Sequence, residues 1–170
     1  EGAWLGFQDY FVRLKCQPEI AEIALLGNRA IAGSKLVIQA FQEADLIVIA
    51  PSNPWVSIDP ILALGGVRDV LQQKLVVAVS PIIKGSALKG PAAKMFNDLG
   101  IKPSAQAVRQ HYEGILDGFI FDNLDLEDAE KWQASAIITE PFQTIMTDDA
   151  DKIALAKAVI SLGVRILQGR

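Results

Sequence analysis

The sequence predicts an α/β protein, a Rossmann-like three-layer sandwich in which helices cover both faces of a mainly parallel sheet. Two apolar runs, residues 46–50 and 75–79, are rich in β-branched residues and have the length of buried strands. Each run ends in a turn that contains proline and serine, and a stretch with helical spacing lies between them. Strands joined by a helical crossover lie parallel, so both turns are expected at the same edge of the sheet.

Length, charge and cysteine content limit the class of protein. The 170 residues are the size of one α/β domain, which can bury a sizeable core. The formal net charge of -4 gives no basic signal for nucleic acid, and no apolar run is long enough to cross a bilayer. Cys16 is the one cysteine in the sequence, which excludes an internal disulfide and a multi-cysteine metal site. A reducing, cytoplasmic setting is therefore the simplest expectation.

The pattern before the first of these strands is less regular. Residues 4–12 alternate aromatic and polar side chains and fit either a strand or a short helix, with the aromatic rings packed on the core. Residues 20–26 alternate loosely and predict a strand that ends at a Gly-Asn turn. Ser34 is expected to cap a helix over residues 35–44.

The remainder of the chain is expected to alternate helices and strands. Ser57 is predicted to cap a helix whose first turn contains Pro60. Further helices are predicted over residues 67–73, 92–99, 105–112 and 150–168. Strands are predicted over residues 116–122 and 134–139, and Pro141 is expected to end the second of them. Residues 82–91 are predicted to form a loop. The last helix is expected to be scaffold, with one apolar face made of Ile153, Ala156, Val159, Ile160, Val164 and Leu167.

The carboxyl edge of the predicted sheet is where open α/β folds bind ligands. Ser52, Asn53 and Ser57 follow the first strand, and Ser80 follows the second. Their hydroxyl and amide groups carry no charge. This combination suits an anionic ligand whose charge is neutralised by other residues.

Lysines after the second strand are candidates for that neutralisation. Lys84 and Lys89 lie in the loop with Gly90, and Lys94 lies in the first turn of the following helix. A lysine beside a helix N-terminus favours an anion, since the backbone N–H donors and the helix dipole add to its charge. The alternative is a solvated loop with ordinary surface lysines. The loop does not match the phosphate-binding pattern G-x-x-x-x-G-K-[ST].

The third apolar strand ends in an acidic cluster, Asp122, Asp125, Glu127 and Asp128. A carboxylate at a strand end can hold Mg²⁺ through its oxygens. The alternative is a solvated segment that caps a helix. His111 is the only histidine, and at a helix end it is expected to be a surface or capping residue rather than a base or a ligand. No catalytic residue is assigned.

Several motifs together resemble the 2-phospho-L-lactate transferase family, which acts in the biosynthesis of the deazaflavin coenzyme F420. Residues 50–64 are similar to the family's GPSNPxxSIGPIL segment. Residues 77–83, 88–94 and 116–122 resemble its VAVSPI, GPAxK and LDxFVxD segments, and residues 6–11 resemble HFQDYF. The motifs occur in order and at family-like spacing, so their combination is specific although each alone is weak.

The sequence also departs from the family pattern. Ala50 replaces a glycine before Pro51, and Asp59 replaces a glycine in the Ser-Ile-x-Pro segment. Asp59 is expected either to point to solvent, where it suits the helix dipole, or to face the ligand and weaken phosphate binding. Family members begin with a strand and a glycine-rich turn that are missing here, and the chain has no initiator methionine. We therefore expect a fragment of a longer transferase, inactive alone.

The resemblance implies a transfer between two substrates. The ribityl hydroxyl of the deazaflavin Fo would attack a phosphorus of guanosine diphospho-lactate or of its phosphoenolpyruvyl analogue, GMP would leave, and Mg²⁺ would be required. Such chemistry depends on in-line positioning and on neutralised phosphate charge. The sequence leaves open whether the domain forms a homodimer. The expected substrate and phosphate contacts are Ser52, Asn53, Pro54, Ser57, Ser80, Lys84, Lys89, Gly90 and Lys94, with Asp122 orienting metal or nucleotide.

Two other functions are compatible with the sequence. One is that of the related gluconeogenesis-factor family, which binds a nucleotide sugar and acts in regulation. Its members carry a GPGSLYTS-like turn, whereas residues 51–57 here read PSNPWVS, so this interpretation ranks lower. The other is a non-catalytic Rossmann-like module, against which the polar turns and the lysine loop argue weakly.

Overall fold

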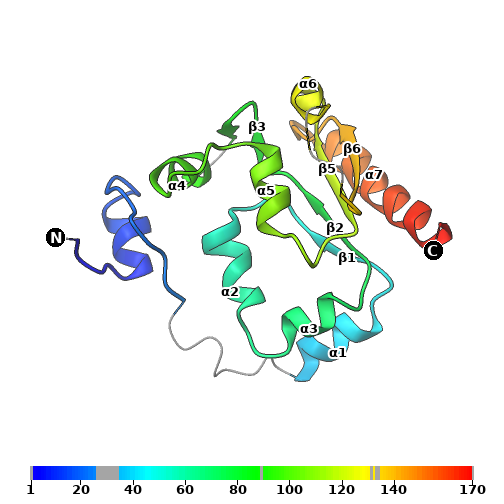
Figure 1. Cartoon of the computed structure of the whole chain (residues 1–170), viewed down its shortest axis with the longest axis horizontal. Coiled ribbons are helices and arrows are strands. Elements are labelled where there is room, and N and C mark those ends of the chain that lie inside the picture. Colours follow the sequence, from blue (N-terminus) through cyan, green and yellow to red (C-terminus); the bar gives the residue numbers. More distant parts are fainter. Residues whose placement is uncertain (1, 26–34, 89, 131, 133–134, 170) are drawn as a thin grey trace.

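A four-stranded sheet forms the centre of the molecule (Figure 1). The structure is a computed structural model, and it describes residues 2–25, 35–88, 90–130, 132 and 135–169. The strand order is β1 (Ile47–Ile49), β2 (Val76–Val79), β5 (Gly118–Asp122) and β6 (Ile138–Phe142). Each neighbouring pair is parallel, so the predicted α/β fold with a mainly parallel sheet is confirmed.

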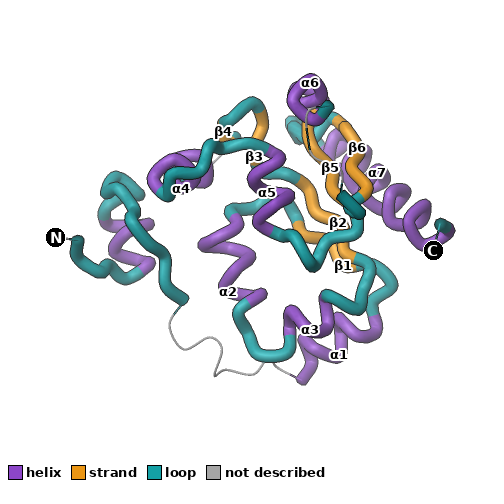
Figure 2. Tube along the Cα trace, in the orientation of Figure 1, coloured by secondary structure: helices purple, strands orange, loops and turns teal. Residues whose placement is uncertain are grey.

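The other elements connect these strands and cover the sheet (Figure 2). Among the described residues, no helix combines the length and the apolar character that a membrane span requires. The elements are η1 (Asp9–Arg13), α1 (Lys35–Glu43), η3 (Pro54–Ile58), α2 (Asp59–Leu62), α3 (Val67–Leu71), β3 (Ile82–Ile83), β4 (Ser86–Ala87), α4 (Ala92–Asp98), α5 (Ala105–His111), η4 (Asn123–Asp125), α6 (Leu126–Ala129) and α7 (Asp149–Gln168).

The sheet separates two hydrophobic cores, which gives the molecule three layers. On one face, side chains of β1, β2 and β5 pack with η3 and with helices α2 to α5. On the other face, Val77, Val79 and Ile120 pack with α7. All four residues of β2 are buried because they alternate between the two cores. This is why the strand reads as a continuous apolar run.

A glycine sets how closely α7 approaches the sheet. A Cβ atom at Gly118 in β5 would lie 2.9 Å from Cδ1 of Ile166 and 3.1 Å from Cδ2 of Leu162. Such separations are shorter than packed carbon atoms tolerate. The absent side chain therefore lets the helix rest directly on the central strands.

The last strand lies later in the chain than predicted and includes a proline. The sequence indicated a strand over residues 134–139 that Pro141 would end, but β6 extends to Phe142, with Pro141 in register with Phe121. β6 is an edge strand. An edge strand tolerates proline because the N–H groups on its outer side need no partner strand. For this reason the sequence wrongly predicted that Pro141 ends the strand.

The predicted strand over residues 20–26 is wrong for the part that the structure describes. Residues 20–25 form no strand. Ile20 and Ile23 pack against the core from an irregular segment, and the Ile20 N–H donates to the Asp98 carboxylate rather than to a neighbouring strand. The loose alternation therefore reflects these side-chain contacts. Ser34 and its predicted cap lie outside the described residues.

Two further features were missed or left open by the sequence. Residues 7–13, in the aromatic segment near the N-terminus, are helical, and η1 forms the C-terminal part of this stretch. The predicted loop over residues 82–91 contains an antiparallel hairpin, β3 with β4. The two turn residues of this hairpin, Lys84 and Gly85, have φ angles of 48° and 73°. Two successive positive φ values are typical of a tight hairpin turn.

The single apolar face predicted for α7 is wrong. Of the residues assigned to it, Val159 is buried, whereas Ile153, Ile160, Val164 and Leu167 are exposed. The buried face also includes Leu155, Leu162 and Ile166. The sequence could not distinguish these faces because apolar residues occur on two sides of the helix.

Candidate functional site

The polar turns predicted to share one edge of the sheet do share it. β1, β2 and β5 run parallel, so their carboxyl ends lie together. Ser52 and Asn53 follow β1, Ser80 follows β2, and Asp122 ends β5.

Asn53 builds the turn after β1. Its Oδ1 accepts hydrogen bonds from the backbone N–H groups of Trp55 at 3.0 Å and Val56 at 3.3 Å, which makes it the cap of η3. Its Nδ2 lies 3.1 Å from Sδ of Met95 in α4. Both the oxygen and the nitrogen of the Asn53 amide are therefore engaged. The prediction that Ser57 caps the helix is wrong, since Ser57 lies within η3.

The other polar groups of this turn are less committed. Pro54 is buried at the first position of η3, where a missing N–H costs nothing. Ser52 and Ser57 are half-buried, and neither hydroxyl makes a hydrogen bond to another described residue. These two hydroxyls are the groups at the turn that remain available to a ligand.

Ser80 stabilises the bend after β2. Its Oγ donates to the carbonyl of Ile82 at 2.9 Å and accepts the Ile82 N–H at 3.1 Å. The side chain is buried. Ser80 thus holds the start of the β3–β4 hairpin.

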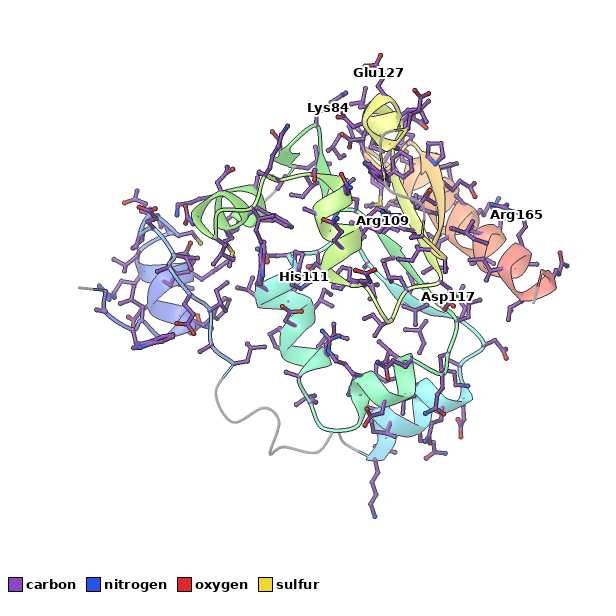
Figure 3. All side chains as sticks on the ribbon, viewed as in Figure 1. Lys84, Arg109, His111, Asp117, Glu127 and Arg165 are labelled. Atoms are coloured by element: carbon purple, nitrogen blue, oxygen red, sulfur yellow. The ribbon has the colours of Figure 1, made fainter. Side chains whose placement is uncertain are left out.

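Lys84 lies at the tip of that hairpin and faces acidic residues. Its backbone N–H donates to Oδ1 of Asp125 at 3.0 Å, and its Nζ lies 3.9 Å from Oδ2 of Asp128. Figure 3 shows Lys84 and Glu127 on the same side of the view, away from His111. Half of the Lys84 side chain is exposed, so its ammonium group remains accessible to an anion.

Lys94 connects α4 to the N-terminal segment. Its Nζ donates to the carbonyl of Pro18 at 2.8 Å and forms an ion pair with Asp98. Asp98 also accepts the N–H of Ile20 at 3.1 Å. Gly90 is exposed with a φ of 75°, a conformation that favours glycine. Lys89 lies outside the described residues.

The Asp122 carboxylate is engaged by three hydrogen bonds within the chain. Its Oδ1 accepts the N–H of Leu124 at 3.0 Å, and its Oδ2 accepts the N–H and the hydroxyl of Thr144 at 2.8 and 2.9 Å. The carboxylate is buried and joins β5 to the segment after β6. Within the described part of the chain, no group of three histidine, cysteine, aspartate or glutamate side chains could hold a metal ion.

Asp125 is the buried carboxylate of the acidic cluster. Its Oδ1 accepts the Lys84 N–H, but its buried Oδ2 has no hydrogen-bond partner among the described residues. Burial raises the pKa of this carboxyl above its ordinary value, and the contact with Lys84 partly opposes that change. Sequence reasoning named Asp125 only as one member of an acidic run.

A cavity of about 830 Å³ adjoins the first turn, and sequence reasoning missed it. Trp55, Val56 and Pro60 form one wall, and Met95 contributes from α4. Segments 2–10 and 18–25 supply the other walls, which include Trp4, Phe7 and Tyr10. Trp4 and Phe7 are exposed rather than packed on the core as expected. The concentration of aromatic residues near the N-terminus was the available signal.

The cavity has a mainly apolar lining. Burial is the main reason that the pKa of Tyr10 is raised to about 12, so this phenol is neutral at physiological pH. Glu19 and Glu22 are the acidic residues among those that line it. A volume of this size, with aromatic walls and few polar groups, is typical of a small-molecule site.

Asp59 faces His111 rather than solvent or the cavity. Nε2 of His111 lies 2.9 and 3.0 Å from the two carboxylate oxygens. The imidazole also meets the ring of Trp55, with 5.5 Å between centroids. Burial, and secondarily the charge of Asp59, raises the pKa of Tyr112. His111 is thus a half-buried partner of Asp59, not the surface or capping residue that was expected.

Comparison with known proteins agrees with the motifs. The family model described as "2-phospho-L-lactate transferase CofD" matches residues 1–164. A 2-phospho-L-lactate transferase of Methanocaldococcus jannaschii is 36% identical over 156 residues, which cover 92% of this chain and 49% of the relative. One of Methanosarcina acetivorans is 35% identical, covering 93% and 52%. A phosphoenolpyruvate transferase of Streptomyces griseus is 33% identical, covering 98% and 53%. The chain spans about half the length of these relatives.

Proposed function

The chain belongs to the 2-phospho-L-lactate transferase family, and we propose that it forms part of the substrate site of a transferase that acts in coenzyme F420 biosynthesis. The donor is proposed to be guanosine diphospho-lactate or its phosphoenolpyruvyl analogue, and the acceptor the deazaflavin Fo. A cytoplasmic location, which suits the single buried Cys16, is part of the proposal.

In the proposed reaction, the ribityl hydroxyl oxygen of Fo forms a bond to the phosphorus that carries the lactyl group. The phosphoanhydride bond of the donor breaks, GMP leaves with the bonding electrons, and the hydroxyl proton passes to water. The product is a phosphodiester. Such a transfer needs in-line placement and compensation of phosphate charge rather than a covalent intermediate.

The cavity beside the turn after β1 is the observation that carries the proposal. Its aromatic and apolar lining suits the flat ring system of a deazaflavin. Trp55 and Val56, which form part of its wall, directly follow the Asn53 turn at the carboxyl edge of the sheet. A ring bound in the cavity would therefore place its ribityl chain near the polar edge.

The donor is proposed to bind along that edge. The uncommitted hydroxyls of Ser52 and Ser57 would donate to phosphate oxygens, and the accessible Lys84 would compensate their charge. Lys94 has a different proposed role, because it already binds Pro18 and Asp98. It would hold segment 18–20, which forms part of the cavity wall.

Mg²⁺ is proposed to arrive with the donor. Magnesium commonly keeps several waters and binds through substrate phosphates and few protein ligands. The described residues provide no cluster of three ligands, and Asp122 is engaged by three hydrogen bonds. We therefore assign the ion no protein ligand and no step of the reaction.

The test is titration of Fo into the 170-residue chain, followed by fluorescence. We expect saturable binding, and we expect Trp4→Ala to weaken it about three- to tenfold, the loss of one aromatic contact. Trp4 is 69% exposed, so the fold should survive the change. Leu36→Ala is the control, because Leu36 is exposed on α1 and does not line the cavity.

Equal Fo affinity in wild type and Trp4→Ala would contradict the placement of the acceptor. A separate titration with GDP and Mg²⁺ tests the donor edge. Ser52→Ala and Ser57→Ala should each weaken nucleotide binding and leave Fo binding unchanged. If both substrates fail to bind while the chain is folded, the proposed site in this chain is wrong.

A further inference from the structure

Lys84 occupies a turn position that suits glycine better than lysine. It is the first of the two turn residues of the β3–β4 hairpin, and its φ is 48°. A residue with a side chain is strained in this left-handed region, whereas glycine adopts it freely. Gly85, the second turn residue, has a φ of 73°. Backbone strain of this kind is concentrated at functional sites, so the lysine needs an explanation beyond the turn itself.

A buried carboxylate holds the strained turn. The Lys84 N–H donates to Oδ1 of Asp125 at 3.0 Å, and Asp125 is 4% exposed. The other carboxylate oxygen, Oδ2, is buried and has no hydrogen-bond partner among the described residues. Burying a carboxylate is unfavourable unless its contacts compensate. The hydrogen bond to the Lys84 backbone is therefore the contact that the buried position of Asp125 provides.

The end of β5 in turn fixes Asp125. Asp125 lies in η4, which is capped by Asp122, since Oδ1 of Asp122 accepts the Leu124 N–H at 3.0 Å. Oδ2 of Asp122 accepts the N–H and the hydroxyl of Thr144, beyond β6. A series of hydrogen bonds thus runs from the segment after β6 through η4 to the turn of the hairpin. This series ties the turn at Lys84 to the strands of the central sheet.

The base of the hairpin is held as well as its tip. Ser80 bonds to both backbone groups of Ile82 and so fixes the bend that leaves β2. Lys84 is therefore supported from two neighbouring strands, β2 and β5. Figure 2 shows the hairpin and α6 at the same end of the sheet. Support of the backbone on both sides limits the region that the lysine side chain can reach.

The ammonium group of Lys84 is held much more loosely than its backbone. Its Nζ lies 3.9 Å from Oδ2 of Asp128, which is too far for a hydrogen bond, and half of the side chain is exposed. An exposed ion pair of this kind contributes little to stability. A phosphate could therefore replace Asp128 as the partner of the lysine. The pair with Asp128 also does not explain why a strained backbone carries this side chain.

We propose that Asp125 is a positioning residue, which holds Lys84 in the strained turn so that its ammonium group meets the donor phosphates at the carboxyl edge of the sheet. The inference rests on the proposed function, in which Lys84 compensates the charge of the donor. Asp125 does not touch the ligand and acts through the Lys84 backbone. Because the turn is ordered before the ligand arrives, binding loses less conformational entropy.

Titration of GDP with Mg²⁺ into the 170-residue chain, followed by calorimetry, tests the role of the lysine. Lys84→Met keeps the stem and removes the charge, so it should weaken GDP binding about three- to tenfold. Lys84→Gly should weaken binding as much. It should also raise the thermal midpoint by about 2 °C, because glycine adopts this φ without strain. Lys152→Met is the control, since Lys152 lies in an exposed pair on α7, and it should change neither quantity.

A double-mutant cycle shows whether Asp125 acts through Lys84. Asp125→Ala should weaken GDP binding about two- to fivefold in the wild-type background and have no effect in the Lys84→Met background. Asp125→Asn keeps an oxygen that can accept the Lys84 N–H, so its affinity should stay within about twofold of wild type. If Asp125→Ala does not fold, Asp125→Leu takes its place, because it fills the same buried space without an acceptor. Circular dichroism checks the fold of each variant.

The outcomes separate this inference from the proposed function. If the folded wild-type chain binds no GDP, the proposed donor edge is wrong, and the role of Asp125 is wrong with it. If wild type binds GDP but loss of the Asp125 carboxylate weakens binding equally in both Lys84 backgrounds, the donor edge stands and Asp125 is not a positioning residue. A lower thermal midpoint for Lys84→Gly would show that the lysine stabilises the turn, which also contradicts the proposal.

Discussion

Asp59 and His111 connect the helix that leaves β1 to the end of α5. Nε2 of His111 lies within 3.0 Å of both carboxylate oxygens, and each side chain is 19% exposed. The imidazole meets Trp55, which forms part of the cavity wall. The Asp59 carboxylate therefore braces the imidazole that contacts this wall.

Removing either partner of this pair should lower the free energy of unfolding. We expect Asp59→Ala to cost about 1–2 kcal/mol, because a partly buried hydrogen bond to a charged group is lost. Asp59→Asn should cost less, since its side-chain oxygen can still accept from His111. Urea denaturation at neutral pH measures the change.

A double-mutant cycle isolates the contact itself. The costs of Asp59→Ala and His111→Ala should fail to add by about 1 kcal/mol, as for residues in direct contact. Strict additivity would show that the two side chains act separately. Lys152→Ala and Asp149→Ala provide a matched exposed pair, for which we expect coupling of only a few tenths of a kcal/mol.

Asn53→Ala should destabilise the protein by about 1 kcal/mol, because the cap of η3 is lost. Asn53→Ser retains an oxygen that can cap the helix but removes the amide near Met95. It should recover most of the stability. Chemical denaturation of both variants provides the measurement. If Asn53→Ala unfolds at the wild-type denaturant concentration and only substrate binding is lost, the side chain acts on the ligand rather than on the turn.

The sequence was sufficient to predict the parts of the fold that depend on local pattern. The apolar runs at β2 and β5 locate the central strands, and the helices at 92–98, 105–111 and 149–168 begin and end within one residue of their predicted bounds. The shared edge of the polar turns followed from the parallel crossover. These features depend on periodicity and on turn residues, which one sequence contains.

The contacts of the site could not be predicted in the same way. Tertiary packing between distant segments brings three pairs of residues together: Lys94 with Pro18, Asp59 with His111, and Asp122 with Thr144. Periodicity also could not show which apolar side of α7 faces the sheet, because both sides satisfy the helical pattern. A charged or amide side chain at the carboxyl edge of the sheet can either bind a ligand or stabilise the fold. Only the geometry distinguishes these two roles.

Lys94→Ala should loosen the N-terminal segment from α4. The ammonium group donates to the Pro18 carbonyl and pairs with Asp98, so its loss leaves that carbonyl without this donor and the carboxylate without its counter-charge. We expect faster amide exchange at Ile20, whose N–H bonds to Asp98, and weaker binding in the cavity. Hydrogen exchange measured by mass spectrometry reports the first effect.

Lys152→Ala is the matched control for Lys94, because it removes a lysine from an exposed pair at similar sequence spacing. It should leave exchange at Ile20 unchanged. If Lys94→Ala affects nucleotide binding in a salt-dependent way and does not alter exchange at Ile20, the lysine acts as a phosphate contact instead. Salt screens an exposed charge strongly, so titration at two ionic strengths distinguishes these roles.

Asp125 should make stability depend on pH. Burial raises the pKa of its carboxyl above the ordinary 3.8 in the folded state. The folded protein therefore holds this proton more tightly than the unfolded chain does. Its contribution to stability is fully present below the ordinary pKa and is lost as pH rises through the raised value.

Asp125→Asn removes the titration and keeps an oxygen that can accept the Lys84 N–H. We expect this variant to be at least as stable as wild type at pH 7, with a flatter stability profile between pH 4 and 7. Asp128→Asn, in an exposed position, should retain the wild-type slope. Denaturation across this pH range tests the assignment, and a steeper profile for Asp125→Asn would show that the charged carboxylate is the form that the fold prefers.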